Sequence, residues 1–257
     1  MRGEGGRLLM MPIGDDNTGR TITPIVNYML LAANVLVFVL LQGLGSNERF
    51  TYAFSTVPAE IVTGRDVAEP VTVKDPVSGE VAGTVDLQPT PIPVYLTLLT
   101  SMFMHGGLAH IFGNMLYLWI FGDNLEDSMG HLRYLLFYLT CGILAGLAHV
   151  FATTAFGGNP YLPALGASGA ISGVLAGYLV LHPKRRVRVI MLRTIQEVPA
   201  IWAIGIWFVF QLVSGLGMLG SGSQAGGVAY AAHIGGFVAG LVLVKFFAAG
   251  RPRYQYT

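Results

Sequence analysis

Residues 163–179, PALGASGAISGVLAGYL, contain four glycines and no charged side chain. A helix that is apolar on every side is buried, either in a large protein core or in a bilayer. We therefore expect a buried helix over residues 167–182, with Ser168 near its start between small neighbours. The rest of the chain decides between a core and a bilayer, and indicates what a serine does at that position.

The composition favours the bilayer. Of the 257 residues, 53% are hydrophobic and only 11% are charged, and the mean hydropathy is +0.59, which is far from the balance of a soluble globular domain. The net charge of +1 gives no reason to expect nucleic acid as a partner. The single cysteine, Cys141, lies in an apolar run and is expected to pack there, because one cysteine allows no intrachain disulfide.

Six segments approach the roughly 20 apolar residues that cross a hydrocarbon core. Residues 182–198, HPKRRVRVIMLRTIQEV, carry five basic residues against one acid, and basic loops stay on the cytoplasmic side of a membrane. An even number of spans places this loop on the same side as both termini, which are also basic. The sequence thus predicts an all-α bundle of six transmembrane helices, at residues 25–44, 102–122, 133–154, 167–182, 199–219 and 228–248.

This topology divides the chain into three parts. Residues 1–24 and 249–257 are predicted to be cytoplasmic, and residues 25–248 to form the membrane domain. Residues 45–92, with seven acids and three basic residues, are predicted to be a long external loop between the first two spans. The first twenty residues contain no apolar run long enough for a cleavable signal peptide. The simplest location is therefore a bacterial-type plasma membrane.

The external loop has two features of its own. Its segment VTVKDPVSGEVAGTVDL alternates valine with polar residues around Asp75, Pro76 and Gly79, which predicts a small exposed β-hairpin. The earlier segment FTYAFSTVPAEIV could instead form an amphipathic element that lies on the membrane surface.

Polar side chains inside membrane helices are costly and therefore mark functional candidates. His110 and Asn114 are four residues apart, so they share one face of the second span, with His105 at its entry. At a rise of about 1.5 Å per residue, these side chains, Ser168 and His233 all fall in or near the outer half of the membrane. A serine beside a histidine is a nucleophile with a general base.

Glycine spacing predicts which helices touch. Small residues four apart let two helices approach closely in lipid. Glycines with this spacing occur on the fourth span as Gly169, Gly173 and Gly177 and on the sixth as Gly236 and Gly240. Close packing of these two spans would bring Ser168 and His233 together.

Structural roles are open alternatives for each of these residues. A serine in the context GASG more often serves helix packing, or bonds the carbonyl four residues back, than it attacks a substrate. His110 with Asn114 could simply fix the helix register, and His149 is expected to be structural or to face lipid headgroups rather than to be catalytic. No cofactor and no metal site are expected, since no intramembrane acid or cysteine completes a ligand set with the histidines.

Three motifs occur in order along the chain. They are H-x4-H-x3-N at residues 105–114, G-x-S-G at residues 166–169 and A-H-x-x-G-x-x-x-G at residues 232–240. Together they resemble the rhomboid family of intramembrane serine proteases, and the resemblance covers about residues 25–248. It implies a six-helix bundle with a water-filled cavity open to the outside, and a Ser-His dyad without an acid.

Carried over by position, the resemblance implies that Ser168 is the nucleophile and His233 the general base. His110 and Asn114 would join the Ser168 backbone N–H in an oxyanion hole. Losing one donor of such a site typically costs about a hundredfold or more in rate. His105 would play a supporting role at the mouth of the cavity.

Other positions match the family pattern or depart from it. Glu126 matches an acidic position that structures the cytoplasmic end of the second span. An aromatic residue that often stacks on the base histidine is replaced by Ser172, and the external loop lacks the Trp-Arg pair of many relatives. Aromatic residues of the fifth span mark a substrate gate by family analogy, and a lipid-facing surface explains them equally well. They are Trp202, Trp207, Phe208 and Phe210.

The sequence therefore predicts a serine endopeptidase of the lipid bilayer that cleaves transmembrane segments of other membrane proteins. No motif indicates an oligomeric state. One alternative is an inactive rhomboid-like protein that binds membrane clients without cutting them. Another is a small-solute transporter, which the lack of an inverted-repeat pattern and of intramembrane acids disfavours.

Overall fold

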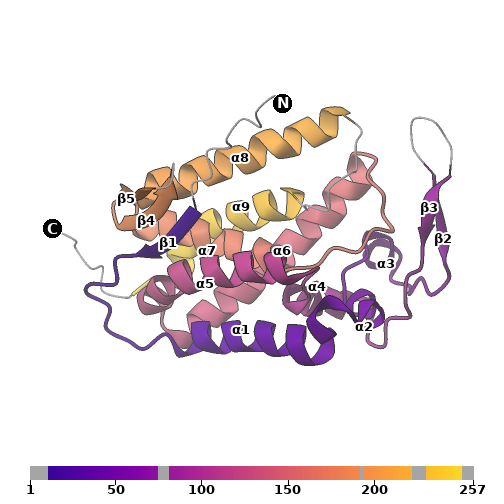
Figure 1. The fold of residues 1–257 in the computed structure, drawn as a ribbon, viewed down its shortest axis with the longest axis horizontal. Coiled ribbons are helices and arrows are strands. Elements are labelled where there is room, and N and C mark those ends of the chain that lie inside the picture. The colour runs from indigo at the N-terminus through magenta and orange to yellow at the C-terminus, as the bar shows by residue number, and fades with distance from the viewer. Residues whose placement is uncertain (1–10, 75–80, 192–193, 222–229, 251–257) are drawn as a thin grey trace.

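The computed structural model describes residues 11–74, 81–191, 194–221 and 230–250. It is mostly helical (Figure 1). Short helices and turns lie between α1 and α5: Gly43–Gly45, α2 (Glu48–Ala53), α3 (Pro58–Thr63), Val94–Leu96, α4 (Thr97–Thr100) and Ser101–Phe103. The longer helices are α1 (Ile25–Leu36), which the π-helical turn Val37–Leu41 extends, α5 (Leu108–Met129), α6 (His131–Ala155), α7 (Ser168–Leu181), α8 (Ala200–Ser221) and α9 (Tyr230–Phe247).

Two of these helices, α6 and α9, are long and apolar enough to cross a membrane. The segments Val94–Phe103 and Leu108–Met129 meet at an angle of 81° and would together make a third, bent span. Shorter apolar helices in the described part of the chain are Ile25–Leu41, Ser168–Leu181 and Ala200–Leu216. The helical, membrane-spanning character of the fold is thus supported, and the count of six spans stays a prediction.

The second predicted span is displaced in the structure. It was expected at residues 102–122, but α5 begins at Leu108 and continues to Met129. The chain bends before α5, where Gly107 has a φ of 154°. At the other end, Asp123 and Glu126 are buried inside the helix. Arg20 donates a hydrogen bond to Asp123, and two backbone N–H groups of α1 donate to Glu126, so these acids do not mark the end of the helix.

Helix α7 lies at the centre of the bundle. Every residue from Gly169 to Tyr178 is buried, as expected for a helix without a polar face. The ribbon shows α7 between α5 and α9, with α8 on one side and α1 on the far side of α5 (Figure 1). Ser168, at the start of this helix, is partly buried.

The backbones of α7 and α9 touch. A Cβ atom on Gly236 would overlap the carbonyl of Gly169, and a Cβ on Gly240 would overlap the backbone of Gly173. Only glycine fits where two helix backbones are this close. These contacts fix the position of the start of α9 relative to the start of α7.

Gly177, the third of the α7 glycines spaced four residues apart, faces α5 and α6 rather than α9. A Cβ on Gly177 would lie 3.1 Å from Leu125 of α5 and 3.2 Å from Phe137 of α6. The free cysteine Cys141 is fully buried beside Gly173, on the α6 side of α7. Small residues thus let α7 contact α6 closely as well as α9.

The all-α prediction missed a three-stranded antiparallel sheet. Strand β4 (Arg186–Met191) pairs with β1 (Met11–Asp15) on one edge and with β5 (Thr194–Pro199) on the other. In β4, Val187 and Val189 are fully buried while Arg186 and Arg188, which alternate with them, are exposed. This alternation with a period of two is the pattern of a half-buried strand, so part of the predicted basic loop is a strand.

The opposite end of the bundle carries α2, α3 and a two-stranded hairpin (Figure 1). Strands β2 (Val71–Lys74) and β3 (Val81–Val85) pair antiparallel, which confirms the predicted hairpin. Its predicted turn at Asp75, Pro76 and Gly79 lies outside the described residues. Helices α2 and α3, which lie in the segment FTYAFSTVPAEIV and next to it, bury Ala53 and Ile61, and the membrane-surface alternative for this segment stays a prediction.

Asp15, at the end of β1, is a buried acid. Its Oδ2 atom accepts hydrogen bonds from the Tyr178 hydroxyl at 2.6 Å and from the Asn124 amide at 2.7 Å. Burial raises the pKa of the Asp15 carboxyl to about 7, and the neighbouring Asp123 adds to this, while the hydrogen bonds and Arg185 act in the opposite direction. The folded protein therefore favours the neutral acid.

This burial predicts a pH-dependent stability. The pKa of the Asp15 carboxyl is about 7 in the folded protein, against its usual value of 3.8. The contribution of Asp15 to the free energy of unfolding is therefore complete below about pH 4 and is lost as the pH rises through 7. We expect this group to lower the unfolding free energy by on the order of 2–3 kcal/mol between pH 5 and pH 8. Asp15→Asn keeps an acceptor oxygen and should remove that part of the pH dependence in denaturant unfolding in detergent.

The matched control for this experiment is the next residue. Hydrogen bonds from Thr18 lower the pKa of Asp16, so Asp16→Asn should leave the profile between pH 5 and pH 8 unchanged. If Asp15→Asn kept the wild-type dependence on pH, the burial argument would be wrong.

Candidate active site

Ser168 and His233 are hydrogen-bonded to each other. The Ser168 Oγ lies 2.7 Å from Nε2 of His233, and both residues are partly buried. Ser168 is the first residue of α7, and His233 lies in the first turn of α9. The two helices meet through the glycine contacts described above, and these contacts hold the serine and the histidine side by side.

The loop before Ser168 is shaped by Gly166. This residue has a φ of 121°, which side chains other than glycine rarely adopt, and its N–H donates to the carbonyl of Ser101 at 2.9 Å. Because Ser168 begins a helix, its own N–H is one of the first four that have no acceptor inside the helix. Such N–H groups at a helix N-terminus attract negative charge.

The ring of His110 lies against this loop. A Cβ atom on Gly166 would be 2.9 Å from Nε2 of His110 and 3.7 Å from Oγ of Ser168. Four residues along α5, the buried Asn114 donates from Nδ2 to the carbonyl of His110 at 3.0 Å. The Asn114 amide has a second N–H. The His110 ring is therefore a neighbour of the loop before α7, and Asn114 lies one turn further along α5.

His105 packs behind His110. Their ring centroids are 5.2 Å apart, edge to face. The His105 side chain is fully buried, and its two ring nitrogens have no hydrogen-bond partner among the described residues. The Gln42 side chain fixes the backbone of His105. Its amide oxygen accepts from the His105 N–H, and its amide nitrogen donates to the His105 carbonyl, both at 2.9 Å. Gln42 was not anticipated from the sequence.

Metal ligation by these histidines finds no support in the part of the chain described. No three His, Cys, Asp or Glu side chains gather there as ligands.

Glu126 lies far from the serine and holds the start of α1. Its carboxylate is fully buried and accepts from the backbone N–H groups of Val26 at 3.0 Å and Asn27 at 2.7 Å. His131, at the start of α6, lies 2.5 Å from the same carboxylate. Glu126 thus connects α1, α5 and α6.

Two polar residues beside the serine and histidine have partners that the motifs did not indicate. Ser172 donates from Oγ to the Ser168 carbonyl at 2.7 Å, the bond four residues back that is common for serine in helices. Nδ1 of His233 lies 2.8 Å from Oε1 of Gln211 on α8. Gln211 is the only amide side chain in the apolar stretch 200–216, and that isolation was the signal that could have identified it.

The aromatic residues of α8 divide into two groups. Trp202 and Phe210 are 63% and 62% exposed, whereas Phe208 stacks on Phe237 of α9 with centroids 3.9 Å apart. The Trp207 ring lies 6.1 Å from the ring of His233. An outward apolar surface and an inward packed surface thus share this helix.

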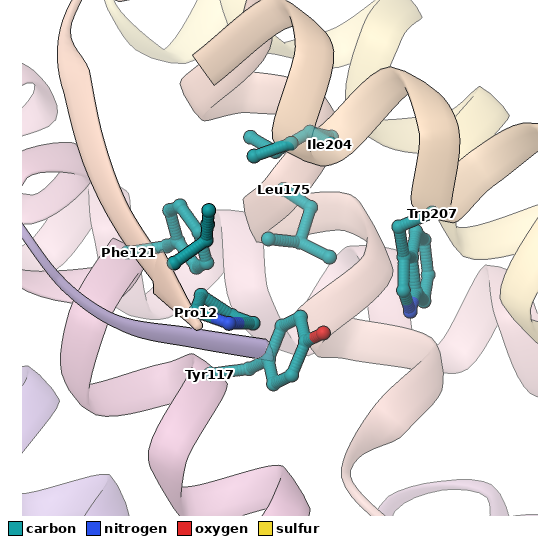
Figure 2. Close-up of a pocket in the computed structure, with 8 residues that line it drawn as sticks. Pro12, Tyr117, Phe121, Leu175, Ile204 and Trp207 are labelled. Atoms are coloured by element: carbon teal, nitrogen blue, oxygen red, sulfur yellow. The ribbon is translucent and has the colours of Figure 1, made fainter. Parts of the chain in front are cut away.

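A small apolar pocket lies between α5, α7, α8 and strand β1. Figure 2 shows side chains of these helices and Pro12 of β1 around it, with Phe121 and Trp207 on opposite sides. Its lining residues are Pro12, Tyr117, Phe121, Leu175, Val189, Ala203, Ile204 and Trp207. Neither Ser168 nor His233 lines it, so this pocket is distinct from the site around the serine.

Comparison with known proteins agrees with the motifs. Residues 93–250 match the Rhomboid domain family model. The chain is similar to the rhomboid protease GluP of Bacillus subtilis, with 29% identity over 228 residues, which are 88% of this chain and 34% of that protein. It is also similar to the mitochondrial rhomboid protein 1 of Saccharomyces cerevisiae, with 30% identity over 160 residues, 61% of this chain and 43% of that protein.

A human relative matches a shorter part. The mitochondrial presenilin-associated rhomboid-like protein is 35% identical over 95 residues, which are 37% of this chain and 24% of that protein. The chain spans less than half the length of each of these relatives. Because the family model covers more than half of the chain, the chain belongs to the rhomboid family of integral membrane proteins.

Proposed function

We propose that this protein is an intramembrane serine endopeptidase that cleaves transmembrane segments of other membrane proteins. The observation that carries the proposal is the 2.7 Å hydrogen bond between Ser168 Oγ and His233 Nε2. A serine hydroxyl becomes a useful nucleophile only when a base stands ready to take its proton. Similarity to a Bacillus subtilis rhomboid protease over 88% of the chain adds support.

The proposed reaction follows from these contacts. Ser168 Oγ attacks the carbonyl carbon of the scissile peptide bond while His233 Nε2 takes the hydroxyl proton. The protonated imidazole then gives this proton to the leaving amine as the C–N bond breaks. Water, activated by the same histidine, hydrolyses the acyl-enzyme and restores the serine.

The negative oxygen of the tetrahedral intermediate needs fixed donors. We propose that the Ser168 N–H, the His110 ring and the Asn114 amide supply them. The free N–H groups at the start of α7 and the neighbouring ring of His110 support this arrangement. Donors that are already oriented in a low-dielectric site stabilise such charge strongly. His105 packs edge-on against His110, and we propose that it keeps the His110 ring in place.

We also propose how the protein lies in its membrane. Six spans would place both termini and the basic segment 182–198 in the cytoplasm and the segment 45–92 outside. The membrane domain would be residues 25–248, flanked by cytoplasmic residues 1–24 and 249–257. The hairpin and the β1–β4–β5 sheet lie at opposite ends of the bundle (Figure 1). Helix α7 ends at Leu181, shortly before β4 begins at Arg186, so its start points away from the sheet, which supports a site near the outer surface. The plasma membrane of a bacterial-type cell is the proposed location.

A fluorescent fluorophosphonate tests the proposal without a known substrate, because it labels an activated serine. Purified protein in detergent should be labelled, while Ser168→Ala and His233→Ala should not. Each variant is first shown to be folded by thermal unfolding. If folded wild-type protein stayed unlabelled, and a single-span test protein stayed intact beside it in proteoliposomes, an inactive client-binding protein or a transporter would be the better description.

A further inference from the structure

His233 has a second hydrogen bond, on the side away from Ser168. Its Nδ1 atom lies 2.8 Å from Oε1 of Gln211 on α8. Gln211 is only 7% exposed, although a buried amide in an apolar helix is costly unless its polar atoms are paired. The pairing of this amide with the imidazole therefore needs an explanation.

The tautomer of the His233 imidazole explains this pairing. A neutral histidine carries one ring proton, and Nε2 can accept from a serine hydroxyl only when that proton is on Nδ1. An Nδ1–H buried among apolar groups needs an acceptor, and the Gln211 carbonyl oxygen is placed to be that acceptor. The amide oxygen thus selects the tautomer in which the nitrogen next to Ser168 is a base.

No other group of the described chain competes for this role. The titratable groups that face His233 are His110 of α5, His149 of α6 and Tyr230 of its own helix. None of them is a carboxylate, which would be the usual partner of a catalytic histidine. An amide oxygen orients the ring without the desolvation cost of a buried charge.

We infer that Gln211 is the positioning residue of the proposed dyad. It fixes the tautomer and the ring orientation of His233 from a third helix, α8. The inference rests on the proposed function. It extends the site from α7 and α9 to α8.

Two substitutions test the acceptor oxygen of Gln211 independently of the size of its side chain. Gln211→Met keeps the length and removes the acceptor, and it should lower the rate of fluorophosphonate labelling about 10- to 100-fold, the range found when a group that orients a metal-bound histidine is lost. Gln211→Glu restores an acceptor oxygen at the same position and should label within about tenfold of wild type. On a single-span test substrate, the methionine variant should lose kcat while KM stays unchanged.

Gln196 provides a matched control. It lies exposed on β5, where its amide contacts Thr194, so Gln196→Met makes the same chemical change far from His233 and should label like wild type. Thermal unfolding of all variants shows whether a loss of labelling follows from a loss of fold. Equal labelling of wild type and Gln211→Met, or no recovery in Gln211→Glu, would overturn the positioning role.

The tautomer can also be observed without any activity. Nitrogen-15 NMR of histidine-labelled protein, with His233→Ala to assign the signal, should show His233 with its proton on Nδ1, and a mixture of tautomers in Gln211→Met. A wild-type proton on Nε2 would mean that the amide donates to the ring, and the inference would be wrong. Unlabelled, folded wild-type protein would instead overturn the proposed function, and this inference with it.

Discussion

Ser168→Ala, His233→Ala and the double variant are expected to lose peptide-bond hydrolysis to the same extent, by about 10⁴-fold or more. The serine hydroxyl and the imidazole are hydrogen-bonded at 2.7 Å, so removing either of them removes the activated nucleophile. Adding the second substitution therefore causes no further loss of activity. The measurement is cleavage of a single-span test protein in proteoliposomes, followed over time for each variant.

Ser172→Ala is the matched control for this series. The Ser172 hydroxyl donates to the Ser168 carbonyl and does not contact the imidazole in the proposed mechanism, so its loss should change cleavage by less than about tenfold. A double variant whose loss was the product of the two single losses would show that the two residues act independently, which contradicts a dyad.

Gly236→Ala is expected to destabilise the fold by at least about 3 kcal/mol, at the upper end of the usual cost of overpacking. The new methyl group would overlap the carbonyl of Gly169. The obstacle is backbone rather than a flexible side chain, so α7 and α9 must move apart. Such movement also separates Ser168 from His233, and we expect fluorophosphonate labelling to fall together with the unfolding temperature in detergent.

Gly205 on α8 gives the control for this prediction. A Cβ atom there meets nothing within 4 Å, and alanine is favoured over glycine inside a helix. Gly205→Ala should therefore leave the unfolding temperature unchanged or slightly raised. If Gly236→Ala unfolded at the wild-type temperature, the two helices would not be in the close contact described here.

The sequence predicted the parts of the site that depend on local spacing. His110 and Asn114 lie one turn apart on α5, as their spacing of four requires. The pairs Gly169 with Gly236 and Gly173 with Gly240 follow from the same geometry. These features need only the helical repeat and the rule that small residues permit close packing. The catalytic roles assigned to the residues stay predictions.

Other parts of the site depend on contacts that no local pattern encodes. Gln42 meets the His105 backbone across 63 positions of sequence, and Gln211 meets His233 across 22. A single amide in a helix gives no periodic pattern from which its role could be predicted, because that role depends on which residue of another segment it contacts. The β1–β4 pairing joins segments more than 170 residues apart, and it was missed for the same reason.

The contact between α7 and α9 has a consequence for biosynthesis. Ser168 and His233 are separated by 65 positions, and α9 is the last helix in the described chain. A ribosome that has made α7 has produced the nucleophile without its base. The proposed enzyme would therefore stay inactive during translation until α9 has entered the bundle, and a chain that still lacks α9 would not cut the membrane proteins inserted beside it.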